Sequence, residues 1–169
     1  MTLRLRPYQL SDEAAALATH DALLADNFHF LLGWRPSMTW AEFLFALENQ
    51  RRGLNLTEDQ VPAVQLAAVV EGELVGRVSV RFARNEFLAE RGGHIGYGVV
   101  PAHRRRGYAT EILRQALVVI RAEGVNRVLV TCDDGNVASS GAIERVGGVL
   151  ESITPSIDGG PGLRRYWIE

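Results

Sequence analysis

The stretch of sequence that decides the fold is HIGYGVVPAHRRRGYAT, residues 94–110. An apolar strand there leads through a proline into a basic, glycine-containing turn, and a helix follows. Backbone N–H groups in the first turn of a helix have no partner within the helix, so together with the helix dipole they attract anions. Gly107 and Ala109 keep this turn shallow, and three consecutive arginines add positive charge. The stretch therefore predicts a binding site for a phosphorylated cofactor.

The spacing Arg104-x-x-Gly107-x-Ala109, directly after a strand and a proline, resembles the acetyl-CoA signature of the GNAT superfamily of N-acetyltransferases. Matching segments extend from about Val64 onward, and their sequences are most similar to a little-characterised bacterial branch of predicted acetyltransferases. The resemblance implies a GNAT fold of the α/β class (α+β in some schemes), in a single domain of residues 1–169. Its central sheet is expected to be mixed but mostly antiparallel, with about six to seven strands flanked by about four helices.

A second segment, RVLVTCDDGNVASSGAIERVGGVL at residues 127–150, shows the order of elements common in GNAT proteins. A strand is followed by Asn136 and Ser139, a short helix and a glycine pair. The segment departs from the family pattern twice. Gly148 stands where Phe is usual, and Ile143 stands where many relatives carry a tyrosine that protonates the departing CoA thiolate. The identity of the general acid is therefore open.

The resemblance implies that acetyl-CoA, as co-substrate, binds between the His94 strand and the Arg127 strand, with its pantetheine arm in the gap. Glycines within the His94 strand agree with this, because glycine inside a strand often marks a bulge or close ligand approach. The alternatives are a solvated helix start or a nucleic-acid contact for the arginines, and plain helix capping for Asn136 and Ser139. The residues expected to bind the cofactor are Val99, Val100, Arg104, Arg105, Arg106, Gly107, Tyr108, Ala109, Thr110, Asn136 and Ser139.

Acetylation of an amine needs a free amine, a polarised thioester carbonyl and a route for protons from nitrogen to sulfur. His94 is our candidate for the general base, since its ordinary pKa is about 6.5 and it precedes the expected thioester site. Glu86 and Glu90 are alternatives, and a structural role for His94 is the simpler interpretation. Tyr97 and Tyr166 are candidates for the general acid, although direct attack can proceed without a dedicated acid.

The composition agrees with this interpretation. The chain has 169 residues, 47% of them hydrophobic, which suffices for one α/β domain with a core. With a net charge of −2 the chain is not a polycation, so we expect neither nucleic acid nor a membrane as a partner. The single cysteine, Cys132, excludes an internal disulfide and a cysteine-based zinc site, and we predict no metal. It is interpreted as a core residue, with an acyl-cysteine intermediate as the alternative.

Local patterns predict the order of elements. Strands are expected at 2–6, 64–70, 74–82 and 94–100, near 128 and 149, and at the final RRYWI; helices are expected from 11, at 40–53, at 105–123 and at 138–146. Aromatic residues in the N-terminal region would either line an acceptor pocket or belong to the core; they are Trp34, Trp40, Phe43 and Phe45. No signal peptide or membrane-spanning run is seen, so we expect a cytoplasmic protein.

We therefore predict an enzyme that moves an acetyl group from acetyl-CoA to a primary amine of a small molecule or peptide, by direct attack in a ternary complex. The alternative is a catalytically idle acyl-CoA-binding domain, a sensor or assembly part, which the isoleucine at 143 motivates. Nucleic-acid binding through the arginine turn is a third interpretation, but the sequence offers no wider basic face. The resemblance also makes a homodimer plausible, and the acceptor is open.

Overall fold

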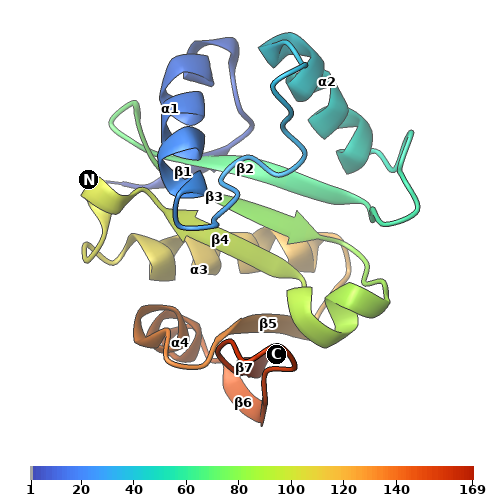
Figure 1. The fold of residues 1–169 in the computed structure, drawn as a ribbon, viewed down its shortest axis with the longest axis vertical. Helices are drawn as coiled ribbons and strands as arrows, with labels where there is room; N and C mark the ends of the chain where they lie inside the picture. The colour runs from blue at the N-terminus through green and yellow to red at the C-terminus, as the bar shows by residue number, and fades with distance from the viewer. Residues whose placement is uncertain (1) are drawn as a thin grey trace.

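The computed structural model describes residues 2–169, which contain seven strands in two antiparallel sheets (Figure 1). The first sheet has the order β1-β2-β3-β4 and the second has the order β5-β7-β6. The strands are β1 (Arg4–Arg6), β2 (Ala63–Val70), β3 (Glu73–Arg81), β4 (Ile95–Val99), β5 (Val128–Asp133), β6 (Val149–Thr154) and β7 (Leu163–Ile168). The α/β class and the number of strands agree with the sequence expectation, and the sheet is divided between β4 and β5.

Three of the four longer helices cover the faces of the first sheet. The four are α1 (Glu13–Leu24), α2 (Trp40–Arg51), α3 (Tyr108–Ala122) and α4 (Val137–Arg145), with short helical turns at η1 (Leu10–Asp12), η2 (Leu88–Gly92) and η3 (Pro101–His103). Figure 1 shows α1 and α2 on one face of the first sheet and α3 on the other, and α4 lies beside α3 and β5. Both faces of β2 and β3 are consequently buried. None of the helices in the described part of the chain is long and apolar enough to cross a membrane.

Two clusters of apolar side chains form the core. On the α3 side, Ile112, Leu113 and Ala116 pack against alternate residues of β2 to β4, because side chains of a strand alternate between the two faces. On the opposite side, Trp40 and Phe43 of α2 pack with aromatic residues from the N-terminal segment. The core interpretation of Trp40 and Phe43 is confirmed, whereas Phe45 is exposed.

The starts of the helices differ in how their free N–H groups are satisfied. At α2, the Thr39 hydroxyl accepts from the Glu42 N–H at 3.2 Å and the Glu42 carboxylate accepts from the Thr39 N–H at 2.7 Å, so the predicted capping box is confirmed. At α3, no side chain among residues 2–169 caps the helix. The helix begins at Tyr108 rather than at 105, because Arg105 and Gly107 adopt left-handed backbone conformations with φ of +63° and +80°.

Candidate active site

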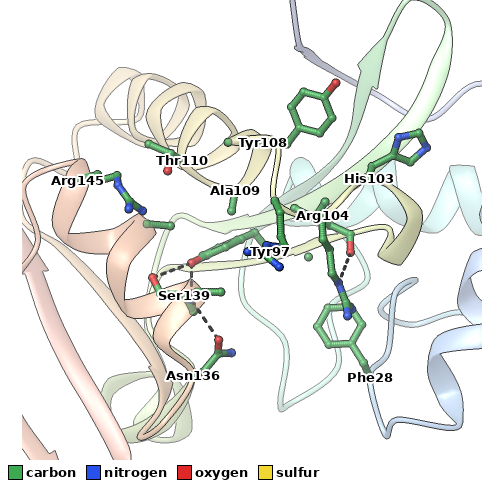
Figure 2. A pocket seen from close by; sticks show the side chains of 16 residues that line it. Phe28, Tyr97, His103, Arg104, Tyr108, Ala109, Thr110, Asn136, Ser139 and Arg145 are labelled. Carbon is green, nitrogen blue, oxygen red and sulfur yellow. Dashed lines mark hydrogen bonds between the residues drawn. The ribbon is translucent and has the colours of Figure 1, made fainter.

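A pocket of about 510 Å³ lies where the end of β4 and the starts of α3 and α4 meet (Figure 2). Nine of the eleven residues predicted to bind the cofactor line it: Val99, Arg104, Arg105, Gly107, Tyr108, Ala109, Thr110, Asn136 and Ser139. The other two do not. The Val100 N–H donates to the Val75 carbonyl within the first sheet, and Arg106 is exposed to solvent. Segments more than thirty residues apart in sequence thus form one site.

One end of the pocket is suited to an anion. The first N–H groups of α3 open into it, and the turn before them carries Arg104 and Arg105, with Arg145 of α4 opposite. The Arg104 Nε donates to the Val99 carbonyl at 3.3 Å, which fixes this side chain along the wall. A Cβ at Gly107 would meet no atom of residues 2–169 within 4 Å, so the glycine is needed for its positive φ and not for space.

The other end of the pocket runs along an unpaired strand edge. His94 accepts from β3 through its carbonyl, and Val100 donates to β3 through its N–H. Residues of an antiparallel strand alternate in the direction of their polar backbone groups, so those of Tyr97 and Val99 point away from β3. Because β4 is the last strand of its sheet, these groups face the gap toward β5. Apart from the Val99 carbonyl, which already accepts from Arg104, they are available to bind an extended chain that carries amides, as pantetheine does.

His94 joins the two sheets at the closed end of the gap. Its backbone N–H donates to the Leu129 carbonyl at 2.7 Å, and its Nδ1 accepts from the Leu129 N–H at 2.9 Å. Burial lowers the pKa of His94 to about 4, helped by the nearby charges of Arg84 and Arg81. With Nδ1 engaged as an acceptor, the neutral ring carries its proton on Nε2 and has no free lone pair. His94 is also absent from the pocket lining, and these contacts favour a structural role over that of the expected general base.

Tyr97 points into the pocket from β4. Its hydroxyl lies 2.6 Å from the Ser139 Oγ of α4, so the two groups share a hydrogen bond across the gap (Figure 2). Burial raises the pKa of Tyr97 to about 12, and the Ser139 hydrogen bond opposes this only in part. The phenol therefore keeps its proton at neutral pH. Of the two tyrosines predicted as acids, this is the one that lies in the pocket.

The other predicted candidates lie elsewhere. Tyr166 is fully buried, and its hydroxyl donates to the Glu144 carboxylate at 2.9 Å, outside the pocket lining. This position does not favour its expected role as general acid, because Tyr166 is absent from the pocket lining. Glu86 and Glu90 are exposed and do not line the pocket either. Cys132 is buried, as expected of a core residue, and burial raises the pKa of its thiol.

The sequence matches the family model "Acetyltransferase (GNAT) domain" over residues 2–149. The chain belongs to the GNAT acetyltransferase family. No curated protein matches it. Three solved structures illustrate the shared fold. Mycobacterium smegmatis RimJ, in complex with CoA-disulfide, is 19% identical with a TM-score of 0.70, over 98% of this chain and 81% of that one.

The second, yncA from Salmonella typhimurium, a putative acetyltransferase with its cofactor acetyl-CoA, is 16% identical with a TM-score of 0.66, over 100% of this chain and 94% of that one. The third, an N-acetyltransferase from Staphylococcus aureus Mu50, is 16% identical with a TM-score of 0.68, over 100% and 99% of the two chains. These similarities support the GNAT fold along the whole chain.

Six residues that line this GNAT pocket were missed from the sequence, and three of them have large side chains. Phe28 comes from the irregular segment after α1 and lies on Gly98, where a Cβ would come within 2.5 Å of the Phe28 ring. His103 also lines the pocket, and its Nε2 lies 3.2 Å from the Glu73 carboxylate. Arg145, at the end of α4, reaches back to the pocket. Only the spaced glycines of β4 gave a sequence signal, since they indicated that something approaches that strand closely.

Proposed function

We propose that this GNAT protein transfers the acetyl group of acetyl-CoA to a primary amine of a small molecule or peptide. The observation that carries the proposal is the meeting, in one pocket, of the uncapped start of α3 and the free edge of β4. The α3 N–H groups with Arg104 and Arg105 fit the diphosphate, and the backbone groups of Tyr97 with the N–H of Val99 fit the pantetheine amides.

Acetyl-CoA supplies an activated thioester. A neutral amine attacks the thioester carbonyl carbon; the C–N bond forms, the C–S bond breaks, and the proton lost by nitrogen ends on sulfur. Backbone N–H groups on the β4 edge are suited to stabilise the negative charge that develops on the carbonyl oxygen. The chain thus contributes orientation and electrostatic stabilisation.

Tyr97 assists the departure of the thiolate by donating a hydrogen bond. Its pKa of about 12 lies well above that of an ordinary thiol, about 8.5, so complete proton transfer from the phenol would be unfavourable. The proton on the product sulfur then comes from the attacking amine. Ser139 holds the phenol in place through the 2.6 Å contact between the two hydroxyl groups. In this scheme Tyr97 assists the leaving thiolate, a role that Ile143 cannot perform because its side chain has no hydrogen-bond donor.

The deprotonation of the amine falls to water. The pocket lining, within the described chain, contains no Asp or Glu. The Nε2 of His103 lies against the Glu73 carboxylate, and its Nδ1, which has no hydrogen-bond partner, is buried away from solvent, so neither nitrogen is placed to take a proton from the acceptor. The rate should therefore rise with pH toward the pKa of the acceptor amine. The same observation favours a second candidate function, an acyl-CoA-binding domain without turnover, because that role needs no base.

Calorimetric titration of the purified protein with acetyl-CoA tests the site, and release of CoA in the presence of an amine panel tests the reaction. The panel should contain amino acids, peptides with free N-termini, polyamines and aminoglycosides. Binding with CoA release that depends on one class of amine supports acetyl transfer. Binding with no release across the panel supports the second candidate, and no binding at all contradicts both.

A further inference from the structure

Two guanidinium groups lie on the α1–α2 side of the first sheet, beside the proposed acetyl site. Arg77 and Arg81 are four residues apart on β3, so their side chains share one face of the sheet. Arg77 is only 5% exposed and donates to the carbonyls of Gly96 at 3.0 Å and His29 at 2.9 Å. Arg81 is partly exposed and donates to the carbonyl of Gly92 at 3.0 Å. Every partner named here is a neutral backbone oxygen.

The two groups converge over Gly96 of β4. A Cβ at that position would lie 3.3 Å from the Arg81 Nη2 and 3.7 Å from the Arg77 Nη1. Gly96 directly precedes Tyr97, and neighbouring residues of a strand are about 3.3 Å apart along its axis. The two positive charges therefore lie within a few ångströms of each other. They are one strand position from Tyr97 along β4 and on the opposite face from its side chain, which is directed toward Ser139.

No carboxylate in residues 2–169 balances these charges, although Arg77 also lies over the Phe28 ring, 4.9 Å from its centroid. Neither arginine forms an ion pair with a carboxylate, and the Arg77 Nε has no hydrogen-bond partner. Burial, with a contribution from the Arg81 charge, lowers the pKa of Arg77 to about 10. The hydrogen bonds from Arg77 to the His29 carbonyl and from Arg81 to the Gly92 carbonyl explain how the loop after α1 and the η2 turn are held in place. They leave unexplained why two full charges of one sign are kept together, since a buried charge without a counter-charge is costly.

We propose that Arg81, with Arg77 behind it, is an anion-binding subsite for the acceptor, and that the acceptor is an amine that also carries a carboxylate, of the amino-acid class. Arg81 contacts the carboxylate because it is the partly exposed member of the pair, and its planar fork matches a carboxylate. Arg77 is too buried to touch the acceptor, but its positive charge adds to the electrostatic attraction for the carboxylate. This inference rests on the proposed acetyl transfer and names its substrate class.

The test compares a panel of amino acids with the primary amide of each, using kcat/KM for CoA release. The amide removes the negative charge and keeps the side chain. Its amine is also less basic, so more of it is neutral at pH 7, which biases the comparison against the proposal. We expect the amino acids to be preferred by at least about 10-fold, in line with one charge-assisted hydrogen-bonded contact.

Three variants test whether Arg81 causes the preference for amino acids over their amides. Arg81→Gln should lower kcat/KM for the amino acids by about 10- to 100-fold, mainly through KM, and leave the amides and the acetyl-CoA affinity unchanged. Arg81→Lys keeps the charge without the fork and should retain part of the preference, which also covers the case that the glutamine variant is unstable. Arg84→Gln removes an exposed arginine three residues further along and should leave the preference for amino acids over amides unchanged.

Equal kcat/KM for acids and amides, or a preference that survives Arg81→Gln, overturns the subsite while the proposed acetyl transfer stands. No CoA release with any member of the panel, although acetyl-CoA binds, overturns the acetyl transfer itself, and the acceptor subsite falls with it.

Discussion

Replacing Gly107 with glutamate should abolish most of the acetyl-CoA affinity while the fold persists. Gly107 has φ of +80°, and a residue with a Cβ loses about 1 to 2 kcal/mol of stability in that conformation. No atom of residues 2–169 lies within 4 Å of the position of a new Cβ, so no clash adds to this cost. The glutamate carboxylate would stand at the start of α3, where the diphosphate is proposed to bind.

The repulsion can be separated from the backbone cost. Two unit charges about 7 Å apart, at an effective dielectric constant of about 20, repel by about 2 kcal/mol, or about 30-fold in affinity. Gly107→Ala is the matched control, because it carries the same backbone cost without the charge. Titration calorimetry of both variants should show a gap of at least about 30-fold between their dissociation constants, and the gap should narrow at high salt.

Thermal unfolding should show the same loss of stability in both variants, at roughly 2–4 °C for each kcal/mol in a chain of this size. If Gly107→Glu binds acetyl-CoA as tightly as Gly107→Ala, the diphosphate does not lie at the start of α3. The assignment of the pocket would then be refuted, whatever the activity of the protein.

Three further outcomes are expected. Tyr97→Phe should lower kcat by about 10- to 100-fold with an unchanged acetyl-CoA dissociation constant, measured by CoA release and calorimetry, because a hydrogen bond to a charged thiolate is lost; an unchanged kcat would remove Tyr97 from the mechanism. The pKa of His94 is about 4 in the folded state against about 6.5 unfolded, so the protein should lose about 2 to 3 kcal/mol of stability as pH falls from 6.5 to 4. Urea unfolding of His94→Asn, which keeps the acceptor for Leu129, should lack that loss, and its neutral-pH rate should equal that of the native protein. Asn136→Ala removes the oxygen that accepts from the Ser139 N–H at 3.1 Å, and should cost about 1 kcal/mol in urea unfolding; a change within error would deny Asn136 its capping role.

The sequence predicted those parts of the molecule that depend on local chemistry. The Thr39–Glu42 capping box and the β2–β3 hairpin follow from neighbouring residues, and both are present. The turn at Glu71 and Gly72 has positive φ at both residues, as a two-residue hairpin turn requires. Most of the residues that line the pocket proposed for the cofactor were also singled out from the sequence, because they lie in two short motifs.

The remaining assignments depend on contacts between distant segments. Whether His94 is a base or a link depends on Leu129, 35 residues away, and only the fold brings the Leu129 N–H to its Nδ1. The sequence around Tyr97 and Tyr166 does not distinguish their roles. In the structure Tyr97 points into the pocket and contacts Ser139, whereas Tyr166 is buried and hydrogen-bonded to Glu144. The convergence of Arg77 and Arg81 on Gly96 likewise follows from strand register, which hydrophobic patterns alone did not specify.

The division of the sheet at β4 has a consequence for the lifetime of the protein. An open strand edge is a place where foreign chains add and where local opening begins, and here it borders the cofactor pocket. An acetyl-CoA molecule lying along that edge would close it as an additional strand would. At a concentration 100 times its dissociation constant, a ligand of the folded state adds about 2.7 kcal/mol of stability. A cell short of acetyl-CoA would then lose the protein to proteolysis and aggregation as well as losing its activity.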